Sequence, residues 1–160
     1  MPDAKAAAAW ALVSMTGDQS AMDYLIQQSK TNPTRQIVEY LGVIQRPEAK
    51  RALEDMIDRK SNLTPIAAVN LIFNQGGSEK ASRAVADELA GNSSLFGIDL
   101  ALNIAAHTND PIIQAAGAEF AAKAKDGLWE LYTVERKDWS IYNWIDGYVI
   151  ELKNNVGPST

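Results

Sequence analysis

The segment 63–92 of the chain reads LTPIAAVNLIFNQGGSEKASRAVADELAGN and contains one complete helix pair. Its first half is apolar with helical spacing and includes Pro65, whose missing N–H is not needed in the first turn of a helix. Gly76 and Gly77 then end this helix, and Ser78 is placed to cap a second, amphipathic helix. The segment therefore predicts two helices joined by a tight turn.

Similar helix pairs precede and follow this segment at a nearly constant spacing. Cut after each second helix, the four repeats are 4–32, 33–62, 63–92 and 93–127. In the first helices one leucine recurs at intervals of 29, 30 and 31 residues: Leu12, Leu41, Leu71 and Leu102. In the second helices the aligned residues are Met22, Leu53, Val85 and Ala116. Two helices in each period of about 30 residues are typical of an α-solenoid. We predict an all-α superhelix with the aligned leucines buried between helix layers.

Caps and prolines mark where these helices begin and end. Most prolines precede a helical pattern and fit the first helical position: Pro33, Pro47, Pro65 and Pro111. The predicted N-caps are Asp18, Asn32, Thr64, Ser78 and Asp110. Glycines mark predicted helix ends, among them Gly17 and Gly127.

The period, the helix-turn-helix unit and the aligned leucines resemble the HEAT-repeat family, in particular its short bacterial form of the phycocyanobilin-lyase-like type. The resemblance covers residue 4 to about residue 126, and the chain lacks the regular Asp-x-x-x-Arg ladder of better-marked members. What the resemblance implies is a curved stack whose second helices line a concave side, where partners dock. Some of these short repeats are known for tetrapyrrole–protein lyase or chaperone activity.

The C-terminal part departs from the repeat and is rich in aromatic residues. Six of the chain's nine Trp and Tyr residues follow Gly127: Trp129, Tyr132, Trp139, Tyr142, Trp144 and Tyr148. Because terminal repeats need an element that covers their open apolar face, we predict a two-helix aromatic cap over 128–153 and a flexible tail over 154–160. Trp139, Tyr142 and Trp144 lie off the stripe that would cover the fourth repeat. We therefore expect them to bind a partner, or to form a homodimer through the cap.

Carboxylates recur at equivalent places in the second helices. Asp55 and Asp87 occupy one such place, and Asp58 lies one turn beyond Asp55. They predict an acidic strip that docks a protein with a basic surface. The alternative is an ordinary solvated face, because six basic residues are interleaved with the acidic ones: Lys50, Arg51, Arg59, Lys60, Lys80 and Arg83.

Composition narrows the function classes. The formal net charge of −5 argues against nucleic acid as the main ligand, and no apolar run approaches the ~20 residues of a membrane span. Without cysteine there is neither a disulfide nor a Cys-type zinc site. His107, at the end of a first helix, is expected to satisfy carbonyl groups there instead of acting as a base. We expect no cofactor, no metal and no catalytic residue.

These patterns predict one HEAT-like domain over 1–153 that binds another protein without catalysis, as an adaptor or as a stoichiometric inhibitor of the immunity-protein type. Two alternatives stay open: the lyase or chaperone activity that the resemblance implies, and a scaffold subunit of a larger complex. We interpret the apolar stretch 6–15 as a first helix and not as a secretory leader. This favours a cytoplasmic location, or a periplasmic one if a leader has been removed.

Overall fold

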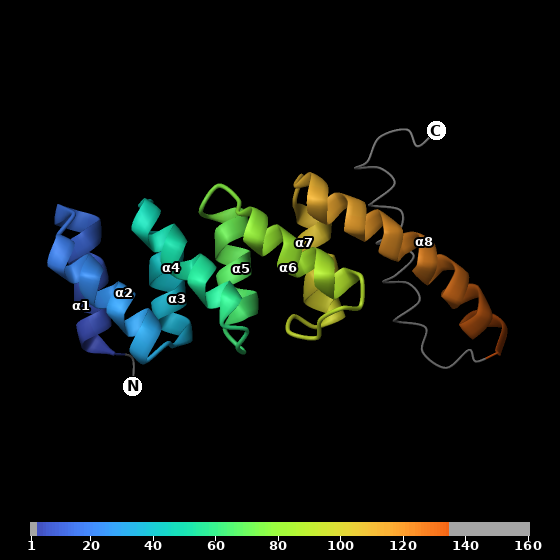
Figure 1. The fold of residues 1–160 in the computed structure, drawn as a ribbon, viewed down its shortest axis with the longest axis horizontal. Coiled ribbons are helices and arrows are strands. Elements are labelled where there is room, and N and C mark those ends of the chain that lie inside the picture. Colours follow the sequence, from blue (N-terminus) through green and yellow to red (C-terminus); the bar gives the residue numbers. More distant parts are fainter. Residues whose placement is uncertain (1–2, 135–160) are drawn as a thin grey trace. The chain divides into compact units, whose positions relative to one another are not determined.

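The computed structural model describes the backbone of residues 3–134 and the side chains as far as Lys123. The described part is entirely helical (Figure 1), as predicted. Its helices are α1 (Ala4–Thr16), α2 (Gln19–Thr31), α3 (Arg35–Val43), α4 (Pro47–Asp58), α5 (Thr64–Phe73), α6 (Glu79–Leu89), α7 (Ile98–His107) and α8 (Pro111–Val134). The chain divides into two compact units, Met1–Ala84 and Val85–Thr160, with the division inside α6. We call them the N-terminal unit and the C-terminal unit.

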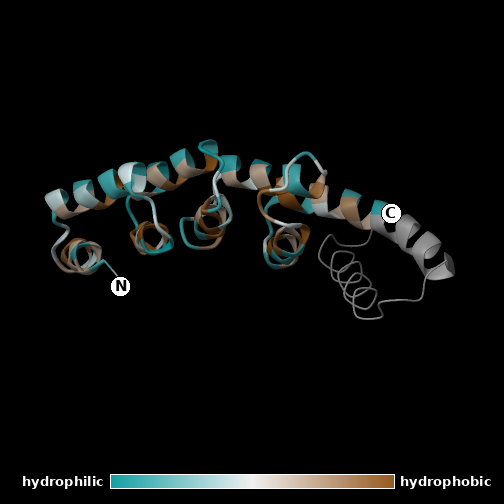
Figure 2. Cartoon of the chain, turned by 90° about the horizontal axis from the view of Figure 1, so that it is seen from below, coloured by the Kyte–Doolittle hydropathy of each residue, from teal (hydrophilic) through white to brown (hydrophobic). Residues whose placement is uncertain are grey.

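In the N-terminal unit, helices pack both within a pair and between pairs. Helix α1 packs on α2 and α3 packs on α4, while α2 also contacts α4 and α3 contacts α5. In Figure 2, α1, α3 and α5 are accordingly seen nearly end-on in one row, with α2 and α4 in a second row. First and second helices of the pairs thus form separate layers in this unit.

The core lies between these layers. Leu41 and Leu71 are fully buried in the N-terminal unit, and Leu102 of α7 is 1% exposed in the C-terminal unit, so burial of three of the four aligned leucines is confirmed. The prediction for Leu12 is wrong, because its side chain is 50% exposed while Val13 is only 6% exposed. The few polar residues of α1, Lys5, Ser14 and Thr16, do not gather on one side, so its sequence does not mark which face packs inward.

In the second helices, too, three of the four aligned residues are buried. Met22, Leu53 and Val85 are fully buried. Ala116 is only half-buried, and Ile113 of the same helix is fully buried. Alanine and isoleucine one turn apart both suit a packed helix face, so the pattern alone could not choose between them.

Several predicted caps are confirmed. The Asp18 carboxylate accepts a hydrogen bond from the N–H of Ala21 at 2.7 Å, and Ser78 Oγ accepts one from Ala81 at 3.3 Å. The carboxylate of Asp110 accepts from the N–H groups of the two residues after Pro111, at 2.9 and 3.1 Å. Pro47 and Pro111 are the first residues of α4 and α8.

Two predicted caps are wrong. Asn32 closes α2, where its N–H bonds to the carbonyl oxygen of Gln28 at 2.9 Å. Because Asn32 still belongs to the end of α2, Thr34 caps α3 and accepts from the N–H of Ile37 at 3.2 Å. Thr64 is already helical, and its hydroxyl group donates to the carbonyl oxygen of Met56 at 3.3 Å.

The predicted helix end at Gly127 is also wrong. Helix α8 continues through this glycine as far as Val134, so no separate short helix begins at Leu128. One glycine inside a helix costs only about 1 kcal/mol relative to alanine, and the neighbouring helix formers outweigh that cost. The remainder of the predicted cap and the tail, 135–160, lies outside the described residues.

Consecutive helix pairs of the N-terminal unit contact one another at matching points of the repeat. Four hydrogen bonds each join residues 29 apart in sequence: Gly17 with Arg46, Gln19 with Glu48, Lys30 with Arg59, and Gln45 with Asn74. The same separation recurs at the inner turns and at the ends of the second helices. Three of these bonds join the first pair to the second, and the fourth joins the second pair to the end of α5.

Gln75 makes the most extensive of these contacts between pairs. Its buried side-chain amide nitrogen bonds to the carbonyl oxygens of Leu41, Gly42 and Ile44 at 3.0, 2.9 and 2.8 Å. These carbonyls lie at the C-terminal end of α3, where a helix has no internal donors left for them. A side chain from the turn after α5 thus caps α3.

We expect Gln75→Ala to lower the free energy of unfolding by about 1–3 kcal/mol, because the carbonyl groups of Leu41 and Gly42 lose a buried donor. The carbonyl oxygen of Ile44 keeps a bond from the N–H of Arg46 at 2.9 Å. Urea denaturation measures this loss. The control is Gln45→Ala, since Gln45 is exposed and bonds to one carbonyl oxygen, that of Asn74, at 2.7 Å. Its expected effect is within about 0.5 kcal/mol. Equal effects of the two substitutions would show that Gln75 does not cap α3.

Candidate partner-binding surface

An acidic cluster lies on α4 beside the start of α6, within the N-terminal unit. Leu53 and Met56 lie on the buried side of α4. Asp55 and Asp58 lie on its exposed side. Lys80 Nζ lies 2.6 Å from Asp58 Oδ2. Three carboxylates and one ammonium group make up this cluster: Glu54, Asp55, Asp58 and Lys80. These four groups carry an excess of negative charge, and two exposed basic residues stand close to them in the chain: Arg51, one turn before Asp55, and Arg59, which donates to the carbonyl oxygen of Asp55 at 3.5 Å.

The electrostatics of Lys80 show that these groups act on one another. Its hydrogen bond to Asp58, and then the negative charges of Asp58, Glu54 and Asp55, raise the pKa of Lys80, while partial desolvation opposes the shift. Because the folded-state pKa is raised, the pairing is fully present below the ordinary lysine pKa and is lost only as the pH rises through the raised value. Both partners are largely exposed, so the pair adds little to stability.

Glu54 is less exposed than its two acidic neighbours and is bonded to the turn before α6. Its carboxylate accepts a hydrogen bond from Ser78 Oγ at 3.1 Å, and the same hydroxyl oxygen caps the first turn of α6. Glu54 is half-buried, whereas Asp55 and Asp58 are exposed. Glu54 therefore connects α4 to the turn before α6, and Asp55 and Asp58 present the charge.

The structure brings only part of the predicted site together. Asp55 and Asp58 lie one turn apart on α4, as predicted. Asp87 is exposed on α6 but belongs to the C-terminal unit. Trp139, Tyr142 and Trp144 lie outside the described residues.

Sequence reasoning left Glu54 and Lys80 out of the site. The sequence predicts Lys80 as one of the basic residues interleaved with the acidic ones, and in the structure it neutralises one carboxylate, that of Asp58. Among the described residues no ion pair involves Asp55. Asp55 is thus the carboxylate of α4 most available to a partner.

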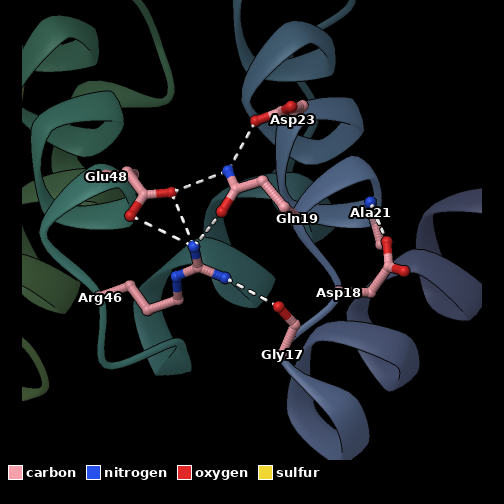
Figure 3. A network of polar contacts seen from close by, with 7 residues as sticks. All are labelled: Gly17, Asp18, Gln19, Ala21, Asp23, Arg46 and Glu48. Atoms are coloured by element: carbon pink, nitrogen blue, oxygen red, sulfur yellow. Dashed lines mark hydrogen bonds and ion pairs between the residues drawn. The ribbon is translucent and has the colours of Figure 1, made fainter.

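A second polar cluster joins the first two helix pairs (Figure 3). Arg46, in the turn before α4, donates to the carboxylate of Glu48 at 3.0 Å, to the carbonyl oxygen of Gly17 at 3.4 Å, and to the side-chain oxygen of Gln19. Gln19 in turn donates to Asp23 at 2.8 Å and to Glu48 at 3.2 Å. The polar groups of this cluster bond to one another between the first and second helix pairs. We therefore interpret the cluster as a contact that holds these two pairs together.

His107 has the role expected of it. Its Nδ1 lies 2.8 Å from the carbonyl oxygen of Asn103 in the last turn of α7, so the prediction that this ring satisfies a carbonyl group at a helix end is confirmed.

Within the described part of the chain, no group of three or more His, Cys, Asp or Glu side chains is arranged to hold a metal ion. None of the helices in that same part has both the length and the apolar character needed to cross a membrane. Comparison of the chain with protein-family models, with curated proteins and with solved structures gives no match.

Proposed function

We propose that the chain is a non-enzymatic protein-binding module that docks a basic partner on the exposed acidic cluster of α4. The observation that carries this proposal is the excess of carboxylates around Lys80, with Asp55 exposed and outside any described ion pair. Such a cluster attracts a cationic surface over a distance set by the salt concentration.

The architecture that we propose for this role is an α-solenoid of four HEAT-like helix pairs, forming one domain over 1–153. Its support is the recurrence of hydrogen bonds between residues 29 apart and the side-by-side packing of α2 with α4 in the N-terminal unit. A stack of this kind offers a broad surface formed by its second helices. Asp23 of α2 is exposed as well, so the neighbouring second helix also carries negative charge.

The partner class that fits is a protein with a cluster of Lys or Arg side chains, held in a stoichiometric complex. An adaptor or an inhibitor of the immunity-protein type would act in this way. We propose three aromatic residues as apolar anchors that increase the affinity for the partner: Trp139, Tyr142 and Trp144. The acidic cluster would mainly increase the association rate. Neither the fold nor the charge of this chain indicates what activity the partner has.

We expect Asp55→Lys to slow association with the partner by about tenfold at low salt and to flatten its salt dependence, because the charge acts mainly on encounter. The partner is recovered with the purified chain as bait and identified, and the association rate is then measured by stopped flow at several salt concentrations. An almost unchanged dissociation rate of the Asp55→Lys variant would support a role of Asp55 in electrostatic steering of the partner.

The matched control is Glu39→Lys, which changes the net charge by the same amount on α3, in the first-helix layer. Glu39 is exposed and, among the described residues, forms one ion pair, with Arg35 at 2.8 Å. We expect this variant to associate at nearly the wild-type rate. If both variants slow association equally, net charge is responsible and the α4 cluster is ordinary solvated surface.

A further inference from the structure

The outward face of α1 is apolar although it is exposed. Its exposed apolar residues follow helical spacing along one side of the helix: Ala4, Ala8, Leu12 and Met15. Leu12 is 50% exposed and Met15 is 83% exposed. The opposite side of the same helix, with Ala6, Ala9 and Val13, is buried. An α-helix that is apolar on both sides is normally covered on both.

This face also carries no acidic side chain. The only charged residue within α1 is Lys5, whose ammonium group lies 4.7 Å from the ring centroid of Tyr24 on α2. The first turn is capped by Asp3, and Asp18 follows the last turn. Charge is therefore confined to the two ends and one edge of the face.

The order of side-chain sizes along the face indicates what covers it. Small residues, Ala4 and Ala8, occupy the N-terminal half, and the large residues Leu12 and Met15 occupy the C-terminal half. When two such helices pair in opposite directions, Met15 of one lies opposite Ala4 of the other, and Leu12 lies opposite Ala8. Large side chains then fill the space left by small ones, as close helix packing requires. A parallel pairing would crowd the large residues together and leave a gap between the alanines.

We propose that the α1 face binds the α1 face of a second copy of the chain, antiparallel and about a two-fold axis. The surface is complementary to itself under that symmetry, which is the condition for a closed dimer. The helix is roughly 20 Å long, and contact along one helix pair falls below the ~1,200 Å² of a stable interface. The dimer is accordingly weak and depends on protein concentration.

The charges at the helix ends give this dimer a particular salt dependence. In the antiparallel arrangement Asp3 of one copy approaches Asp18 of the other at each end. Screening of this repulsion, together with the apolar contact, makes added salt strengthen the dimer. Binding of a basic partner at α4 weakens with salt, so the two associations respond in opposite directions.

Sedimentation velocity over a concentration series of the purified full chain tests the dimer. We expect Leu12→Glu to raise the dimer dissociation constant at least tenfold, because a charge would be buried against Ala8 of the second copy. Met15→Glu is the second variant, at a site exposed enough to leave the fold intact. Phe73→Glu is the control, since Phe73 is 43% exposed at the end of α5. It is expected to leave the dissociation constant unchanged.

Cross-linking tests the antiparallel register directly, because the chain has no cysteine of its own. An equimolar mixture of Ala8→Cys and Leu12→Cys chains is expected to form a disulfide-linked dimer in several times the yield of either variant alone. Equal yields in all three samples would contradict the register. A chain that stays monomeric at every concentration, or a Phe73→Glu variant that dissociates like Leu12→Glu, would overturn the proposal.

Discussion

Leu71→Ala is expected to lower the free energy of unfolding by about 2–5 kcal/mol through loss of apolar contact and formation of a cavity. Leu71 is fully buried in α5, a helix that contacts both α3 and α4. Its carbonyl oxygen accepts a hydrogen bond from Gly77 at 2.9 Å, which holds the turn after α5. The site is thus enclosed on several sides and has little room to collapse.

Leu12→Ala removes the same atoms from a half-exposed position and is the matched control. It should cost less than about 1.5 kcal/mol, because much of its surface already contacts water. Urea denaturation at low protein concentration compares the two variants. Similar small losses for both would mean that α5 does not occupy the centre of the N-terminal unit.

Gly42→Ala is expected to destabilise the protein by about 1–3 kcal/mol, although alanine favours a helix by about 1 kcal/mol over glycine. A Cβ atom on Gly42 would overlap the side chain of Asn70 on α5 and would lie 2.8 Å from its Cβ. Asn70 is buried and is held by bonds to Ile66 at 2.9 Å and Asn74 at 2.8 Å, so it cannot swing away.

A double-mutant cycle with Asn70→Ala identifies the cause of this loss. Since alanine at position 70 removes most of the overlapping atoms, the combined loss should be smaller than the sum of the single losses. Thermal and urea unfolding of the four proteins give the coupling. Stabilisation by Gly42→Ala, the result that helix propensity alone gives, would rule out the close approach of α3 and α5.

The features that could be predicted from the sequence are those that depend on residues close together in the chain. The caps at Asp18, Ser78 and Asp110 follow from side chains that reach their own helix, and burial of Leu41 and Leu71 follows from amphipathic spacing. The apolar pattern of α1 has no polar side to orient it, which is why Leu12 was misplaced.

Contacts between helices were not predictable in the same way. Gln75 and Asn70 look like ordinary turn and helix residues, and their roles arise from the approach of α5 to α3. Likewise, the exposure of Asp55 and Asp58 follows from the pattern of α4, but the pairing of Asp58 with Lys80 depends on the geometry of the turn before α6. Helix α8 continues through Gly127 because its neighbours favour helix more than one glycine opposes it.

The most direct test of the partner-binding proposal is photo-cross-linking from α4. A benzoylphenylalanine residue replaces Asp55 in one variant and Glu39 in another, and each is irradiated in cells that naturally make the chain. The account predicts that position 55 yields one protein adduct of 1:1 mass with a basic partner, and that position 39 yields little of it. Adducts of equal yield at both positions, or none at position 55, would contradict docking on the acidic cluster of α4.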